Sequence, residues 1–448
     1  MSAFRSADVA YCLAILTHHA GPEADALRAR CYMRAGRPHE AVDLLSGIDV
    51  TALPHRAASE LLVLKFASAI AIGDAEMADT ALLEAKARSY GVGSIELESE
   101  FRFYCALFAW TQRRYDDARE ELTALIEARS DVPSWLVDTT HTYAFNRSYW
   151  VARAYELLGL TAARHGDFAS QAALLLRAFE EYDRAACVDV RIEAAMLSNL
   201  AVLVRDLQSP ELEAFVRERC ERVAWNRALD EHRFLVLRAL GWCHALSGDH
   251  LGGLRHFRRS ADVAPSVALR ITALLDRAFI AGELNERFFA SEELELACRL
   301  AADVDFDGAG GNERLVLLDL ARALADVDVV QARRMLDRYA SIRGSMSALE
   351  VYANDRRRRA EECLARADVA RAEGQSDRAT MLYKEAFEIW SAIGYEWRAA
   401  AAALEIHTLT GEPDYLAVAA REAAARPQSW IARRYAKVVH AVHAQTRT

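Results

Sequence analysis

The sequence predicts an all-α protein, on three observations. The chain of 448 residues contains only eight prolines, and Ala, Leu, Glu and Arg are abundant, which favours helix nearly throughout. Runs of β-branched residues of the kind that a buried parallel sheet needs are missing. Apolar residues recur at helical spacing along most of the chain. The hydrophobic fraction of 52%, with 27% charged residues, is typical of a folded soluble protein and excludes bulk disorder.

The clearest pattern lies in residues 234–265, which we interpret as two helices with a turn between them. Gly248 breaks the chain in the middle of this stretch, and Pro265 stops the second helix. Gly241 and Gly253 lie at positions where a larger side chain would keep the paired helices apart. The stretch therefore predicts one compact helix–turn–helix unit.

This stretch resembles the tetratricopeptide repeat family, whose pattern is Trp-x2-Leu-Gly-x2-Tyr, then Ala-x3-Phe, then Pro. Leu237-x2-Leu240-Gly241 and Gly253-x3-Phe257 fall in register, with Leu, His and Gly replacing the family's Trp, Tyr and Ala. The chain also resembles the helical solenoids of large bacterial signal-responsive regulators. The resemblance implies a right-handed superhelical solenoid of antiparallel helix pairs, in which the first helix of each pair lines a groove that receives a peptide or a partner helix.

The same helix–turn–helix unit recurs along the chain, with a spacing of about 40 residues rather than the minimal 34. The predicted units, in chain order, are 24–47 turning at Gly36, a unit turning at Gly73, 101–128 with Ala118 and Leu122, a unit from Tyr155 turning at Gly166, 194–216 turning at 208–210, 234–265, 363–390 turning at Gly374, and a last pair in 396–439 broken at Gly411 and Pro413. Between residues 266 and 345 the motif fades, although helical periodicity continues.

Two segments interrupt the pattern. Residues 130–148 lengthen one interval, and residues 303–312 form a Gly-rich loop. The second loop predicts a division into an N-terminal arm, 1–302, and a C-terminal arm with capping helices, 312–448, continuous with the first. Neither segment is long enough to be a flexible linker between domains.

The charge balance argues against general affinity for nucleic acid, because the net charge is −10 and the isoelectric point is near 5.8. The basic run 355–359 nevertheless keeps an alternative open, a DNA-binding transcriptional regulator with a tetratricopeptide-like sensor solenoid. The more economical interpretation of the run is a solvated helix with local ion pairs, because Glu361 and Glu362 follow it.

The cysteines and the hydropathy predict a cytoplasmic protein. The eight cysteines are scattered singly without any C-x-x-C pair, which is typical of buried thiols in a reducing compartment. No run approaches the 18 apolar residues of a membrane span, so we expect no membrane partner.

Residues 303–308 spell the first half of a calcium-binding EF-hand loop through Asp303, Asp305, Asp307 and Gly308. The twelfth position, which should supply a bidentate Glu, holds Arg314. This departure favours a solvated acidic loop over a metal site. His244, His250 and His256 do not share one helix face, so we do not expect them to cluster.

No catalytic motif, phosphate-binding loop or dinucleotide fingerprint is present, so we expect no enzyme activity and no cofactor. The resemblance instead implies a binding module for a protein or peptide partner, and homo-oligomerisation stays open. Carried over by register, the groove-facing residues are Phe103, Trp110, Arg153, Asn199, Arg205, Arg238, Trp242 and Arg371. Arg can clamp a carboxylate and aromatic rings supply contact area, but each position has the alternative of interhelical core or plain surface.

Overall fold

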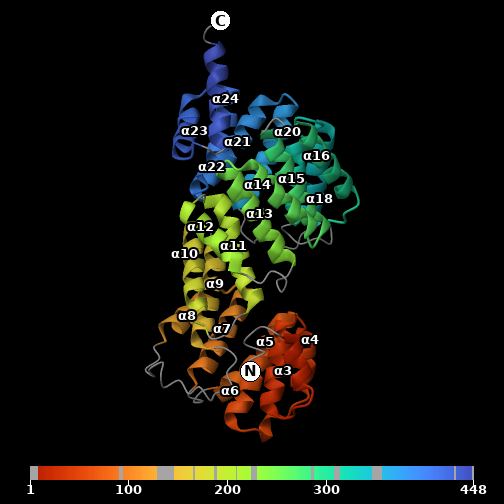
Figure 1. Cartoon of the computed structure of the whole chain (residues 1–448), viewed down its shortest axis with the longest axis vertical. Coiled ribbons are helices and arrows are strands. Elements are labelled where there is room, and N and C mark those ends of the chain that lie inside the picture. Colours follow the sequence, from red (N-terminus) through yellow and green to blue (C-terminus); the bar gives the residue numbers. More distant parts are fainter. Residues whose placement is uncertain are drawn as a thin grey trace. The chain divides into compact units, whose positions relative to one another are not determined.

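A computed structural model describes residues 9–89, 94–128, 146–164, 167–185, 189–207, 209–222, 230–283, 287–306, 313–345, 356–427 and 430–445. In this part of the chain every regular element is a helix (Figure 1). The first helices are α2 (Val9–Leu16), α3 (Pro22–Arg34), α4 (Pro38–Ser46), the short 3₁₀ helix η1 (Val50–Ala52), α5 (His55–Ile72), α6 (Ala75–Ser89), α7 (Ile95–Thr111) and α8 (Tyr115–Glu127). The prediction of an all-α fold is confirmed.

The helices continue in pairs. They are α9 (Arg147–Arg164), α10 (Phe168–Asp183), α11 (Val190–Leu207), α12 (Pro210–Arg222), α13 (Asp230–Leu246), α14 (His250–Asp262), α15 (Val267–Glu283), α16 (Arg287–Ala302), η3 (Glu313–Leu315), α17 (Val316–Leu324), α18 (Val329–Ser345), α20 (Arg356–Ala372), α21 (Ser376–Ala392), α22 (Glu396–Thr410), α23 (Pro413–Ala425) and α24 (Trp430–Gln445). Consecutive helices pack on each other and on the next pair, which is the tetratricopeptide-like arrangement that the sequence predicts.

The chain divides into two compact units. The first comprises Met1–Thr161 and Ser170–Met196, and the second comprises Ala162–Ala169 and Leu197–Thr448. The boundary at 303–312 between two arms remains a prediction. In the second unit, residues on both sides of that loop belong to one hydrophobic core, which includes Ile271, Phe306 and Leu317.

Glycines in the left-handed backbone region make the turns between paired helices. Gly36, Gly73, Gly248, Gly374 and Gly411 have φ between 72° and 91°, and each follows the first helix of a pair. An L-residue with a Cβ rarely adopts this conformation, whereas glycine does so at little cost. The sequence predicts all five of these turns. Of its other predicted turns, Gly166 lies outside the described residues, and the turn at 208–210 falls where α11 ends at Leu207 and α12 begins at Pro210.

The α13–α14 pair shows why its two small residues matter. A Cβ on Gly241 would lie 2.6 Å from the ring of Phe257, and one on Gly253 would lie 3.0 Å from the carbonyl oxygen of Gly241. The two helices therefore cross at a distance that only glycine permits. Phe257 is fully buried at this crossing and packs edge-on against Trp242, with ring centroids 5.5 Å apart.

Candidate partner-binding surface

In the second unit, charged side chains join the first helices of several successive pairs. We call this set the charge ladder. It consists of Arg238 on α13, Asp276 on α15, Arg322 and Asp326 on α17, Glu361, Asp368 and Arg371 on α20, Arg398 and Glu405 on α22, and Arg434 on α24. Because the rungs connect successive first helices, they lie along one face of the stack and not within single hairpins.

The first rung is a bidentate pair. Arg238 donates from Nε and Nη2 to the two carboxylate oxygens of Asp276, at 2.5 and 3.2 Å. The Arg238 side chain keeps about a fifth of its surface exposed. A planar guanidinium held in this way has a fixed orientation, which is the form in which Arg recognises carboxylates.

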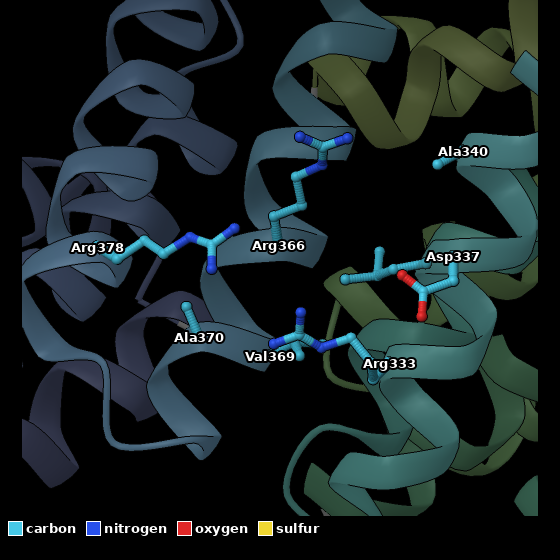
Figure 2. Close-up of a pocket in the computed structure, with 8 residues that line it drawn as sticks. Arg333, Asp337, Ala340, Arg366, Val369, Ala370 and Arg378 are labelled. Atoms are coloured by element: carbon cyan, nitrogen blue, oxygen red, sulfur yellow. The ribbon is translucent and has the colours of Figure 1, made fainter. Parts of the chain in front are cut away.

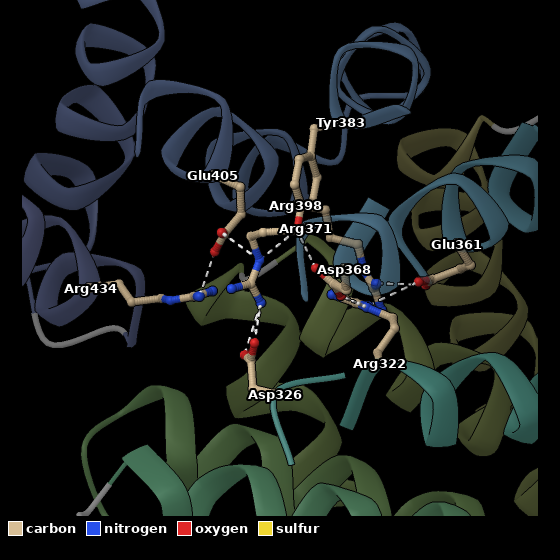
Figure 3. A network of polar contacts seen from close by, with 9 residues as sticks. All are labelled: Arg322, Asp326, Glu361, Asp368, Arg371, Tyr383, Arg398, Glu405 and Arg434. Atoms are coloured by element: carbon tan, nitrogen blue, oxygen red, sulfur yellow. Dashed lines mark hydrogen bonds and ion pairs between the residues drawn. The ribbon is translucent and has the colours of Figure 1, made fainter. Parts of the chain in front are cut away.

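Around Arg322 the ladder is a cluster of ion pairs (Figure 3). Arg322 contacts Asp368 at 3.0 Å and Glu361 at 3.4 Å, and Arg398 contacts the other oxygen of Glu361 at 2.6 Å. Burial raises the pKa of the nearby Asp319, and the Glu361 carboxylate raises it further. This cluster neutralises its own charges, so we assign it a structural role.

Arg371 lies between Asp326 and Glu405 in the ladder (Figure 3). Its Nη2 donates to both oxygens of Asp326 at 2.9 and 2.8 Å, its Nε donates to the hydroxyl of Tyr383 at 3.4 Å, and Glu405 lies 3.9 Å away. Burial opposes the charge on Arg371, but the hydrogen bonds with Asp326 and Tyr383 outweigh it and raise the pKa of the guanidinium.

The two acidic partners of Arg371 differ in exposure. Glu405 is 17% exposed, whereas Asp326 is 67% exposed. An exposed carboxylate in an ion pair contributes little stability and exchanges readily with competing groups. Asp326 is therefore the carboxylate of the pair that solvent reaches, while Glu405 and Tyr383 also contact Arg371.

Helix α24 brings the end of the second unit back onto its earlier helices. The ring of Trp430 lies 5.7 Å from that of Trp397 on α22 and 5.3 Å from that of Phe279 on α15. Arg433 donates to Nε2 of His250 on α14 at 2.6 Å, and Arg434 pairs with Glu405. The charge ladder is thus bordered by an aromatic seam, which consists of Phe279, Trp397 and Trp430.

The structure places the predicted groove residues in different environments. Arg238 and Arg371 belong to the same ladder. Phe103 and Trp242 are only 2% and 7% exposed and pack between helices, so neither offers contact area in this conformation. In the first unit Arg153 pairs with Glu156 and lies 5.1 Å over the ring of Phe103.

The other predicted groove residues are Trp110, Asn199 and Arg205, and their surroundings neither support nor oppose contact with a partner. Trp110 is half-buried on α7 and its ring packs 6.2 Å from that of Tyr115, and Asn199 is half-buried on α11. The side chain of Arg205 lies outside the described residues. That any of these residues contacts a partner stays a prediction.

The sequence interpretation missed the acidic half of the ladder and three of its arginines, Arg322, Arg398 and Arg434. One signal was available: on α20, Glu361 and Asp368 are seven residues apart and Arg371 follows three later, which places all three on one helix face. Their partners are more than 30 residues away in the chain, and no local pattern identifies them.

The acidic loop and the basic run have ordinary surroundings where the structure describes them. Asp303 and Asp305 are exposed, Asp307 lies outside the described residues, and Arg314 is buried. Among the described side chains, no group of three or more His, Cys, Asp and Glu is placed to hold a metal ion. In the basic run, Arg359 pairs with Glu385 and Arg357 lies 5.9 Å over the ring of Tyr395. DNA binding through this run stays a prediction.

The expectation that the histidines stay apart is wrong for two of them. His244 and His256 stack with ring centroids 4.9 Å apart, because the turn at Gly248 folds α14 back along α13. Nδ1 of His244 lies 2.9 Å from a carboxylate oxygen of Asp249. Burial lowers the pKa of His256 to about 4, and His244, Arg259 and Arg217 lower it further.

This stack predicts a pH-dependent stability. His256 prefers its neutral form in the folded state, so the stabilisation is complete above its ordinary pKa of 6.5 and is lost as the pH falls towards about 4. We expect the melting temperature to fall across this range, and to fall less in a His256→Gln variant. The exposed His440 provides the matched control. An identical acid profile for the wild type, His256→Gln and His440→Gln would contradict this account.

The paired helices and their stacking define the class, an all-α helical-repeat protein of tetratricopeptide type. No protein-family model and no curated protein sequence matches the chain. Among solved structures, it is similar to a Rap protein complexed with competence and sporulation factor, with TM-score 0.47 and 11% identity over 79% of this chain and 98% of that one.

Two further solved structures are similar over long stretches. The apo form of the quorum sensor NprR from B. thuringiensis gives TM-score 0.46 and 14% identity, covering 87% of this chain and 97% of that one. Yeast Tom70 gives TM-score 0.39 and 13% identity, covering 98% and 92%. The fold assignment rests on the helix pairs themselves. In the described part of the chain, no helix combines the length and the apolar character that crossing a membrane requires.

Proposed function

We propose that the protein is a non-catalytic, regulatory scaffold that docks a segment of a partner protein on the charge ladder of the second unit. The observation that carries the proposal is the arrangement at Arg371, where Tyr383 and Glu405 hold a guanidinium whose remaining partner is the exposed Asp326. An intramolecular carboxylate on a positioned guanidinium has the geometry that a partner's carboxylate would adopt. The segment that fits is therefore acidic.

Arg238 provides a second anchor of the same kind on the same ladder. Its pair with Asp276 is less accessible, so we assign it to orientation of the segment and assign the main contact to Arg371. Cytoplasmic location is part of the proposal, and the free thiols of the seven described cysteines support it. Small movements at each helix-pair interface change the curvature of such a stack, so an occupied ladder can alter a distant surface.

The test uses two substitutions with opposite expected effects. Arg371→Gln removes the main anchor, so we expect at least a tenfold loss of affinity for the partner. Asp326→Ala removes the internal competitor, and we expect affinity to rise. Arg299→Gln, a 68% exposed arginine on α16, is the matched control. Partners are captured from the native host, identified, and their binding is measured by calorimetry, with circular dichroism to verify folding.

The effects of Arg371→Gln and Asp326→Ala on partner binding together decide whether the charge ladder is the docking surface. Equal binding by Arg371→Gln and the wild type would show that the ladder is not the docking surface. Weaker binding by both Arg371→Gln and Asp326→Ala would show that the pair matters for structure and not for exchange with a partner. If the wild type retains no protein partner, the scaffold proposal fails.

A further inference from the structure

A pocket lies on the other side of helix α20 from the charge ladder. It has a volume of about 210 Å³ and lies between α18, α20 and α21 (Figure 2). Its lining consists of Arg333, Leu336, Asp337, Ala340, Arg366, Val369, Ala370 and Arg378. Arg366 in the pocket and Arg371 on the ladder are five residues apart on α20, so they point in directions about 140° apart.

Three arginines from three different helices border this pocket. Arg333 comes from α18, Arg366 from α20 and Arg378 from α21, and Asp337 is the one carboxylate in the lining (Figure 2). Like charges are costly to bring together unless counter-charges accompany them. Glu373 and Glu362 accompany Arg333 and Arg366 from outside the lining, whereas the lining itself presents three cations and one anion and so favours a ligand that carries negative charge.

The three arginines already have partners, but not all of their N–H donors are used. Arg333 donates from Nε to one oxygen of Glu373 at 2.9 Å and from Nη2 to the other, and Arg366 pairs with Glu362 at 2.7 Å. Arg378 donates from Nη1 to the neutral side-chain amide of Gln375 at 3.1 Å and is exposed. A guanidinium has five N–H donors in a planar fork, so the two contacts of Arg333 and the single contacts of Arg366 and Arg378 leave other donors available for oxyanions.

The pocket also has an apolar side. Leu336, Val369 and Ala370 contribute to the lining, and the last two are almost fully buried. The volume is below the range of about 300–1,000 Å³ that is typical of sites for drug-sized ligands, so the pocket suits one small group. A phosphate monoester combines a charge of about −1.5 to −2 and three acceptor oxygens with an organic stem.

We propose that this pocket binds the phosphate group of a phosphate monoester. Arg333, Arg366 and Arg378 take the phosphate oxygens, Leu336 and Val369 contact the stem, and Asp337 accepts a hydrogen bond from a ligand hydroxyl or N–H. The site is separate from the charge ladder and does not depend on the function proposed for it.

Calorimetry with the full chain at constant ionic strength tests the proposal, with inorganic phosphate and phenyl phosphate as probes. We expect both to bind, phenyl phosphate more tightly because its ring reaches the apolar side. Arg378→Gln and Arg366→Gln are each expected to weaken binding at least tenfold, whereas Arg299→Gln, which also loses one exposed positive charge, leaves it unchanged. Circular dichroism verifies that the variants are folded.

Three results would overturn the proposed phosphate site or its assignment to a monoester. Absence of binding of both probes to the wild type overturns the site. Equal weakening by Arg299→Gln shows a general charge effect and also overturns it. Binding of inorganic phosphate without phenyl phosphate overturns the assignment to a monoester. An O-phosphoserine peptide titrated alongside free phosphoserine then distinguishes a phosphorylated protein from a small metabolite as the source of the group.

Discussion

Replacing Arg30 by Met is expected to lower the free energy of unfolding by about 3–5 kcal/mol, the usual cost of removing one partner from a buried ion pair. Arg30 on α3 donates from Nη2 to Glu100 on α7 at 2.7 Å and to Glu60 on α5 at 3.1 Å. Arg30 is 4% exposed, and Glu100 is completely buried. The substitution leaves two carboxylates close together without their shared cation, so the loss comes mainly from uncompensated buried charge.

Arg37→Met is the matched control, because Arg37 pairs with Glu40 at 2.8 Å in an exposed position. We expect that variant to change stability very little, because exposed ion pairs contribute little. Burial raises the pKa of Glu100, and Arg30 opposes this effect. Without Arg30 the carboxyl protonates more readily, so the deficit should be smaller in mildly acidic than in neutral solution.

Urea unfolding of Arg30→Met, Arg37→Met and the double variant Arg30→Met with Glu100→Gln measures these effects. The double variant removes the buried negative charge and should recover part of the loss. Equal destabilisation by the buried and the exposed substitution would refute the description of this cluster as a buried ionic core.

The hairpin turns were predictable because a single residue determines each one. A glycine with positive φ makes a tight reversal at little cost, and the glycines at 36, 73, 248, 374 and 411 are visible in the sequence, whereas the α7–α8 turn uses Arg113 at φ 64°. The α17–α18 pair was not identified because its turn contains no glycine. There Asp328 caps α18 by accepting from the backbone N–H of Gln331 at 3.0 Å.

The candidate site was only partly predictable, because its geometry depends on how the helices cross. Repeat register places Trp242 on the first helix of its pair, yet that register does not distinguish the groove from the interface with α14. The close crossing at Gly241 and Gly253 turns Trp242 towards Phe257 and buries it. Arg238, four residues earlier, reaches Asp276 on the next pair instead.

The second prediction with a large expected effect concerns the aromatic seam of α24. Trp430→Ala should destabilise the second unit by about 3–5 kcal/mol, the typical cost of truncating a buried Trp. Trp430 is 6% exposed, and its neighbour Ile431 is also buried. Met381→Ala is the control, because Met381 is 61% exposed and its truncation should change stability by about 0.5 kcal/mol at most.

The helices that lose protection from hydrogen exchange in Trp430→Ala are more informative than the size of the loss in stability. In a simple repeat stack each pair contacts only its neighbours, so damage at α24 would spread no further than α22 and α23. Trp430 also contacts Phe279 on α15, which is several pairs earlier in the chain. Hydrogen exchange of Trp430→Ala should therefore show lost protection in α15 as well as in α22. If the loss were confined to α22–α24, the contact with Phe279 would contribute nothing to stability, and the second unit would behave as an open stack.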